Sequence, residues 1–279
     1  MHIQPREMML PAARATIEQG RPDLDLIRRC QQDPAALVAF LDSIEVGRVA
    51  LINYVAPDLM GFTAEVNAWA ARYRAGARGR VIAFGGIHPP KCPDVRAELR
   101  RLLDDLRLDG IKIHPPHQAL AADAYRTGAC PELEIVYRTC QERGVPIMFH
   151  TGTSLFPGAR SRLGDALVFD DVALDFPELT IVLAHGGRPL WMAEAFFLAR
   201  RHANLWLDIS GIPPKALLEY FPRLEEISDK VLFGTDWPSP GVKSLRQNLN
   251  DVLALALSPA AKDRIVRTNA LRLFPIEGR

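Results

Sequence analysis

Histidine and aspartate residues stand at the ends of several short apolar runs in this chain. His114 ends GIKIH, His150 ends PIMFH, His185 ends IVLAH and Asp236 follows VLFGT, while His2 lies at the very start, in HIQP. Neutral imidazole and carboxylate are ligands for Zn²⁺ and similar divalent ions, and a catalytic zinc commonly takes three protein ligands and one water. The pattern therefore indicates a divalent metal site.

The apolar runs form a series that predicts a parallel sheet. Each run is short and β-rich and is followed by a stretch of helical periodicity, and the run ends are spaced near the ~30 residues of a βαβ unit. We predict strands at Gly47–Asn53, Arg80–Gly86, Gly110–His114, Pro146–His150, Thr180–His185, Asn204–Ile209 and Lys230–Thr235. Helices are expected at Ala35–Asp42, Asp94–Leu106, Pro131–Arg143, Pro189–His202, Lys215–Ile227 and Pro259–Leu273.

An eighth strand before Pro5 would complete an α/β fold, a (β/α)8 TIM barrel whose first strand is truncated. The 279 residues suit one such barrel of typically ~250 residues, so we expect residues 1–279 to form a single domain. The last strand of a closed barrel adjoins the first, which places Asp236 beside His2. His150 and His185 would lie on neighbouring strands, so one ion could contact all four side chains.

Composition excludes several classes of function. Lys plus Arg number 34 against 33 for Asp plus Glu, a balance that gives no electrostatic basis for binding nucleic acid or an anionic membrane. No apolar run reaches the ~18 residues of a membrane span, and the first residues lack the apolar core of a secretory signal. We expect a cytoplasmic protein whose partner is a small molecule. A homodimer is a reasonable expectation for an enzyme of this size, although the sequence shows no interface patch.

The motifs HIQP, GIKIHP, FHTGT, LAHGG, GTDWP and NALRLF, in this order, resemble those of the amidohydrolase superfamily. The chain is similar to its amidohydrolase-related metal-dependent hydrolases, the branch that includes aminocarboxymuconate semialdehyde decarboxylase-like enzymes. The resemblance implies metal ligands in an H-x-H pair on the first barrel strand, at His150 and at Asp236. It implies for His185 either a second-metal ligand or a group that polarises or protonates the substrate.

The amino terminus departs from the pattern of this family. HIQP aligns His2 with the second histidine of H-x-H, and an alternative alignment makes His2 the first and Gln4 the second. Either alignment leaves one imidazole missing. A wrongly chosen start codon, a shortened chain and a site that works with fewer ligands are three explanations, of which we favour the first two.

Lys112 decides between two kinds of metal site. A carboxylated Lys112, at the position where binuclear relatives carry such a bridging residue, would support two ions, whereas a free ammonium would bind a substrate carboxylate. An ion pair with Asp236 is the structural alternative. We favour one ion, Zn²⁺ or else Mn²⁺, held among His2, His150, His185, Asp236 and Lys112.

Residues at the rim of the barrel are expected to bind the substrate. Arg160 and Arg188 can each clamp a carboxylate through two parallel hydrogen bonds. Further candidates are His114, His117, Asn53, Tyr54, Trp191 and Trp237.

The leading hypothesis is a metal-dependent hydrolase of a small carboxylated ester, lactone or amide. A bound ion would make hydroxide available at neutral pH. Asp236 would accept the proton of that water, and His185 would polarise the carbonyl or protonate the leaving group. The alternative is a metal-dependent, non-oxidative decarboxylase of an unsaturated or aromatic acid. A metal-free barrel with a binding role is a third hypothesis.

Overall fold

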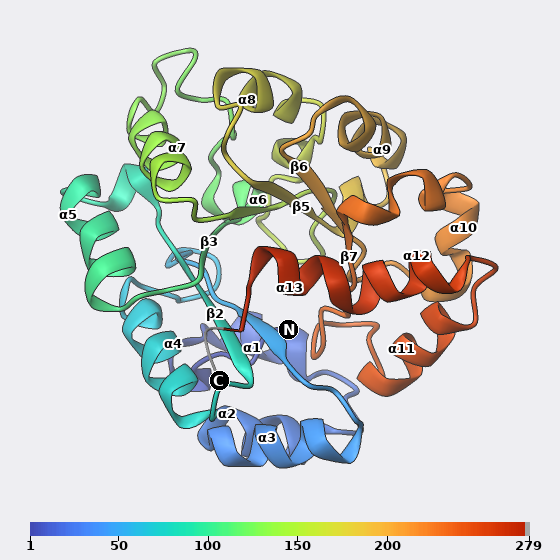
Figure 1. Cartoon of the computed structure of the whole chain (residues 1–279). Helices are drawn as coiled ribbons and strands as arrows, with labels where there is room; N and C mark the ends of the chain where they lie inside the picture. The colour runs from blue at the N-terminus through green and yellow to red at the C-terminus, as the bar shows by residue number, and fades with distance from the viewer. Residues whose placement is uncertain (277–279) are drawn as a thin grey trace.

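A seven-stranded parallel sheet, with its strands in sequence order from β1 to β7, forms the centre of the computed structural model (Figure 1). The structure describes residues 1–276. The strands are β1 (Val49–Ile52), β2 (Val81–Gly86), β3 (Gly110–Ile113), β4 (Ile147–His150), β5 (Ile181–Ala184), β6 (Leu205–Asp208) and β7 (Val231–Leu232). This architecture is a TIM-barrel-like α/β fold, as predicted from the sequence.

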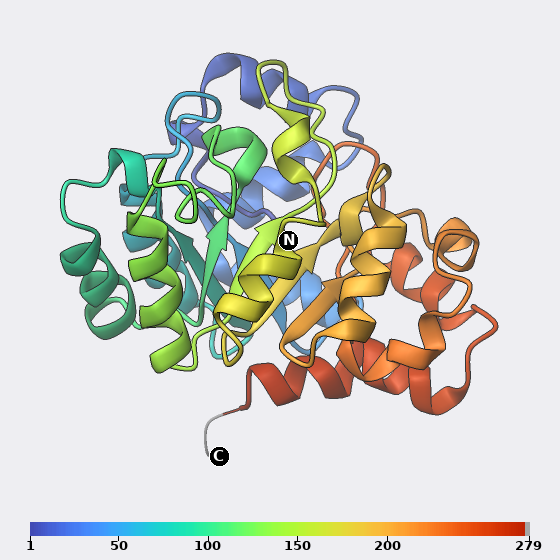
Figure 2. The same cartoon turned by 90° about the horizontal axis from the view of Figure 1, so that it is seen from above.

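Helices surround the sheet and cover its outer face (Figure 2). They are α1 (Pro11–Glu18), α2 (Leu24–Gln32), α3 (Pro34–Ser43), α4 (Glu65–Gly76), α5 (Val95–Arg100), α6 (Pro115–Gln118), α7 (Glu132–Glu142), α8 (Phe169–Asp175), α9 (Met192–Arg201), α10 (Leu217–Tyr220), α11 (Leu245–Leu253), α12 (Pro259–Asp263) and α13 (Asn269–Leu273). Within residues 1–276, none of these helices has the length and apolar character that crossing a membrane requires.

Three predicted helices are shorter or interrupted in the structure. The segment Lys215–Ile227 contains Pro222, and a short helix α10 ends two residues before it because proline cannot continue the backbone hydrogen bonding of a helix. Asp94–Leu106 becomes α5 followed by a π-helical turn, and Pro259–Leu273 becomes α12 and α13 with a π-helical turn between them. The helices named from the sequence did not include α1, α2, α4, α6, α8 and α11.

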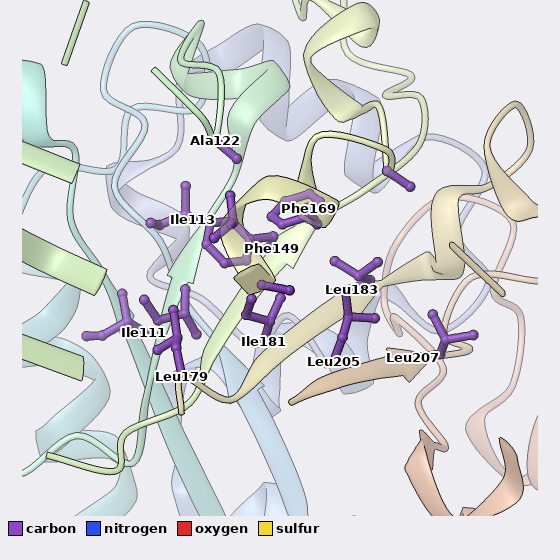
Figure 3. Close-up of a cluster of buried hydrophobic side chains, with 14 of the residues drawn as sticks. Ile111, Ile113, Ala122, Phe149, Phe169, Leu179, Ile181, Leu183, Leu205 and Leu207 are labelled. Carbon is purple, nitrogen blue, oxygen red and sulfur yellow. The ribbon is translucent and has the colours of Figure 1, made fainter. Parts of the chain in front are cut away.

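Side chains alternate between two cores because successive residues of a strand point to opposite faces. Ile111, Ile181, Leu183 and their neighbours pack outward under the helices, and Phe169 of α8 lies against Phe149 at a ring distance of 4.7 Å (Figure 3). The residues between them in sequence point inward. This alternation places Lys112, His150 and Asp208 on the inner face at the carboxyl ends of their strands.

Among residues 1–276, the short segment Met1–Ile3 occupies the position of the eighth strand. The Met1 ammonium donates to the Ala50 carbonyl at 2.8 Å, and the Ile52 amide donates to the Met1 carbonyl at 2.9 Å. On the other side, the His2 amide donates to the Trp237 carbonyl at 2.9 Å. Three residues therefore bridge β1 and the segment after β7 at the carboxyl edge of the sheet.

The amino-terminal half of the same position holds a cavity of about 860 Å³. Its walls are mostly apolar and include Phe84, Val182 and Leu232 from the strands. Helix α13 borders it, and Phe274, directly after that helix, packs edge-on against Phe84 at 5.6 Å between ring centroids. Lys112, on β3, also lines this cavity, so the cavity extends to the residues at the carboxyl ends of the strands.

Two predicted catalytic residues have a left-handed backbone, which is uncommon outside glycine. His185 and Asp236 each have φ of 67°, a conformation that costs a residue with a Cβ of the order of 1–2 kcal/mol. His185 follows β5 directly, and Asp236 follows the short strand β7. Both side chains line a pocket at the carboxyl ends of the strands.

This conformation predicts an unusual order of stability for substitutions at His185. The His185→Gly variant should be about 1 kcal/mol more stable than His185→Ala, because only the alanine retains the left-handed cost. At His150, which lies inside β4, the glycine variant should instead be the less stable by about 0.5–1 kcal/mol. Urea unfolding of the four variants measures both differences. The same order at both positions would contradict the assigned backbone.

Candidate active site

A narrow pocket of about 80 Å³ lies at the carboxyl ends of the strands. Segments far apart in the sequence contribute its walls, including α1 through Ile17 and the long loop after β4 through Ser154. The sequence-predicted residues among its lining are His2, Gln4, Tyr54, Lys112, His114, His117, His150, His185, Arg188 and Asp236. The structure thus brings together the side chains that were expected to converge.

His2 and Asp236 are in direct contact, with 2.9 Å between His2 Nε2 and Asp236 Oδ1. Burial alone would raise the pKa of the Asp236 carboxyl. The charges of His185 and His2 and the hydrogen bonds from His2 and Ser239 outweigh burial, and the pKa lies well below its usual value. Asp236 is therefore an ionised carboxylate beside an imidazole, as the sequence analysis placed it.

The carbonyl and hydroxyl groups of Ser210, just after β6, hold His185 in one orientation. Its Nδ1 donates to the Ser210 carbonyl at 2.9 Å, which leaves the Nε2 lone pair available. Asp208 accepts from the Ser210 amide at 3.1 Å and from its hydroxyl. Burial lowers the pKa of His185 to about 4, and Asp236 opposes that effect, so the ring is neutral near pH 7.

His150 lies between the other imidazoles. Its ring centroid is 4.8 Å from that of His185 and 3.9 Å from that of His114. His150 Nε2 is 3.2 Å from the Thr153 carbonyl, an acceptor, so this nitrogen carries the hydrogen. Burial, followed by the charges of its neighbours, holds the pKa of His150 well below its usual value.

The donor types suit a divalent ion, but their arrangement in this structure is not a ready-made site. Imidazole nitrogen and carboxylate oxygen are the ligands that Zn²⁺ and Mn²⁺ accept, and His2, His150, His185 and Asp236 all line one pocket. Within residues 1–276, however, no three His, Cys, Asp or Glu side chains already form a group able to hold a metal. An ion would have to replace the direct contact between His2 and Asp236.

Lys112 is a buried cation on the inner face of β3, with 2% of its surface exposed. Burial lowers its pKa to about 8, although Asp236 and Asp208 act in the opposite direction. Its ammonium forms no ion pair within 4 Å in the part of the chain that the structure describes, so the pairing with Asp236 considered from the sequence is absent. The amine is available for a substrate anion.

Four predicted substrate-binding residues, Trp191, Trp237, Asn53 and Arg160, lie outside the lining of this pocket. Trp191 is partly buried and packs against the hydrophobic core. Trp237 is a core residue that packs on Phe40 and donates from Nε1 to Asp23 Oδ2 at 2.8 Å. Asn53 is fully buried directly after β1. Arg160 is exposed on the loop after β4. Arg188 does line the pocket, and its guanidinium donates to the Gly211 carbonyl.

Asp208 and Ser210 are functional candidates that the sequence reasoning missed. The signal for Asp208 was available, because the run NLWLDI alternates and Asp208 stands at one of the positions whose side chains point inward.

Gly152 fixes the neighbouring loop, since it has φ of 91° and an added Cβ would lie 2.0 Å from the Arg188 carbonyl. The Thr153 amide donates to that same carbonyl at 2.9 Å, which joins the loops after β4 and β5.

Curated relatives of this chain act on small carboxylated molecules by two chemistries. The chain is 24% identical over 244 residues to gamma-resorcylate decarboxylase of Rhizobium sp. strain MTP-10005, covering 71% of each protein. It is 29% identical over 157 residues to 2-pyrone-4,6-dicarboxylate hydrolase of Comamonas testosteroni, covering 42% of this chain and 51% of the relative.

Solved structures share the fold. A TIM-barrel protein of Bordetella bronchiseptica has a TM-score of 0.74 at 22% identity, covering 99% of this chain and 95% of that one. A 5-carboxyvanillate decarboxylase of Novosphingobium aromaticivorans, complexed with manganese and 4-hydroxy-3-methoxy-5-nitrobenzoic acid, has a TM-score of 0.66 at 15% identity, covering 93% and 85%.

The amidohydrolase family model matches residues 14–276. The match begins after His2 and Gln4 and includes the segments that carry the other lining residues of the pocket. It confirms the resemblance carried by the sequence motifs. The chain belongs to the amidohydrolase family.

Proposed function

We propose that this protein is a metal-dependent decarboxylase of a small aromatic acid. The observation that carries the proposal is the convergence of His2, His185, Asp236 and the unpaired Lys112 on one narrow pocket. The decarboxylases among the relatives support this chemistry over hydrolysis. This order reverses the preference drawn from the sequence alone.

A bound divalent ion would supply positive charge that orients the reacting carboxylate and stabilises the electron-rich ring. His2, His150 and Asp236 are the residues proposed to hold it, which leaves His185 Nε2 free for proton transfer. Manganese in a structurally similar decarboxylase supports this part of the proposal, with Zn²⁺ as the other candidate. Lys112, with its ammonium unpaired, would bind a carboxylate or phenolate oxygen.

In decarboxylation the bond between the ring carbon and the carboxylate breaks, and its electron pair remains on the ring carbon. That carbon must receive one proton as CO₂ leaves. His185 is suited to deliver it, because Ser210 fixes its Nδ1 hydrogen and leaves Nε2 to take up a proton from solvent water and then donate it to the ring carbon. The Asp236 charge raises the proton affinity of His185, which helps it to hold that proton.

Hydrolysis of a lactone or ester is the second candidate function. The 29% identity to a 2-pyrone-4,6-dicarboxylate hydrolase is the observation that favours it. The same residues would serve, with Asp236 accepting a proton from water and His185 protonating the leaving oxygen. The two chemistries differ in their products, so an assay separates them directly.

We expect CO₂ release from at least one hydroxylated benzoic acid and no opening of pyrone dicarboxylates or lactones. The measurement is CO₂ evolution alongside chromatography of both substrate panels, with protein supplied with Zn²⁺ or Mn²⁺. His185→Gln should lower the rate of CO₂ release at least 100-fold, because it removes the positioned acid. Ring opening without CO₂ release would replace this proposal with the hydrolase.

Metal content provides an independent check. Protein supplied with Mn²⁺ or Zn²⁺ and then desalted should retain about one equivalent, and Asp236→Ala should retain far less because a charged ligand is lost. Asp229→Ala, which removes an exposed carboxylate, is the matched control and should retain metal normally. A wild-type protein that retains no metal would favour the metal-free binding role.

The lowered pKa of Lys112 predicts how kcat/KM falls along the alkaline limb of the pH profile. kcat/KM should fall as pH rises through about 8, because the neutral amine no longer attracts a substrate anion. Lys112→Arg should move this limb to higher pH, since a guanidinium stays charged. Exposed Lys91→Arg is the control and should leave the profile unchanged. An alkaline limb that does not move in Lys112→Arg would remove Lys112 from substrate binding.

A further inference from the structure

His117 joins two hydroxyl groups from different parts of the barrel rim. Its Nδ1 is 3.0 Å from the Tyr54 hydroxyl, which follows β1, and its Nε2 is 2.7 Å from the Ser154 hydroxyl, in the loop after β4. All three side chains line the pocket. His117 itself lies on α6 after β3, so three separate loops meet through one imidazole.

The number of polar hydrogens on Tyr54, His117 and Ser154 shows whether one remains to bind a ligand. A neutral imidazole and two hydroxyl groups carry three hydrogens, and the two contacts use two of them. One hydroxyl hydrogen therefore points away from His117. It belongs to Ser154 if Tyr54 donates to Nδ1, and to Tyr54 if Ser154 donates to Nε2.

The surrounding contacts favour the first arrangement. The Phe156 amide donates to Ser154 Oγ at 3.3 Å, so this oxygen already acts as an acceptor. A phenolic hydroxyl is ordinarily a stronger hydrogen-bond donor than a serine hydroxyl, and burial, which raises the pKa of Tyr54, keeps the Tyr54 hydroxyl protonated and able to donate. Phe156 also packs edge-on against His117 at 5.1 Å, which holds the loop in place.

We propose that Tyr54 and His117 orient the Ser154 hydroxyl so that its free hydrogen binds an oxygen atom of the substrate. Ser154 is then a specificity-determining residue, and Tyr54 and His117 are positioning residues. The oxygen belongs to the carboxylate or to a ring hydroxyl of a small aromatic acid. The choice of a small aromatic acid as the ligand rests on the proposed function. The direction of the hydrogen bonds among Tyr54, His117 and Ser154 does not depend on it.

Binding of unreacted acids tests the role of Ser154. Ser154→Ala should raise the Kd of 2-hydroxybenzoate about tenfold, the typical effect of losing one hydrogen bond to a charged or polar ligand oxygen. A parallel loss with benzoate assigns the hydrogen bond to the carboxylate, and a loss with 2-hydroxybenzoate alone assigns it to the ring hydroxyl. Ser154→Thr, which keeps the hydroxyl, should restore most of the affinity.

Ser161→Ala is the matched control in the same loop. Ser161 Oγ accepts from the Ser154 amide at 3.4 Å but does not line the pocket, so its loss should leave Kd unchanged. Tyr54→Phe should raise Kd severalfold, and adding it to Ser154→Ala should have no further effect. Additive losses, or an unchanged Kd in Ser154→Ala, would overturn the proposal.

The tautomer of His117 separates failure of this proposal from failure of the proposed function. Side-chain ¹⁵N chemical shifts of the free wild-type protein should show a hydrogen on Nε2 and none on Nδ1. Tyr54→Phe should populate the second tautomer. A hydrogen on Nδ1 in the wild type overturns the assigned direction whether or not any acid binds. Absence of binding by both acids, with the expected tautomer, counts against the aromatic-acid function instead.

Discussion

The site depends on the hydrogen bonds by which three residues close the barrel. Met1 pairs with β1, and His2 pairs with the segment after β7, so the backbone of Met1–Ile3 fixes where the His2 side chain lies. The contact of 2.9 Å between His2 and Asp236 follows from that closure. Below these residues the sheet opens onto the large apolar cavity, so the bridge has little other support from neighbouring strands.

Burial sets the chemistry of the side chains around this bridge. Lys112 and Asp236 are charged groups inside a barrel, an arrangement whose desolvation cost is repaid only by compensating contacts. Asp236 has such contacts, whereas Lys112 lacks an ion pair within residues 1–276. A substrate anion would supply one. The neutral imidazoles of His150 and His185 contribute nitrogen lone pairs to the site. Lys112 contributes a positive charge that no ion pair within residues 1–276 compensates.

Much of this arrangement could be predicted from the sequence, because the signals are local. The ends of the apolar runs identified His150, His185 and Asp236, and the family resemblance singled out Lys112. Other features depend on tertiary contacts. Trp237 neighbours Asp236 in sequence, yet its indole turns away to Asp23, and the expected strand Lys230–Thr235 pairs only over Val231–Leu232. The left-handed backbone of His185 and the His117 contacts also required coordinates.

The most direct test of the central claim is an anomalous difference map from crystals of the protein grown with Mn²⁺. The account predicts one strong peak within about 2.0–2.3 Å of an imidazole nitrogen of His150 and an Asp236 oxygen, with His2 rotated to share the ion. A strong peak elsewhere, or none while His2 and Asp236 keep their direct contact, would contradict the proposal that these residues converge to hold a catalytic metal.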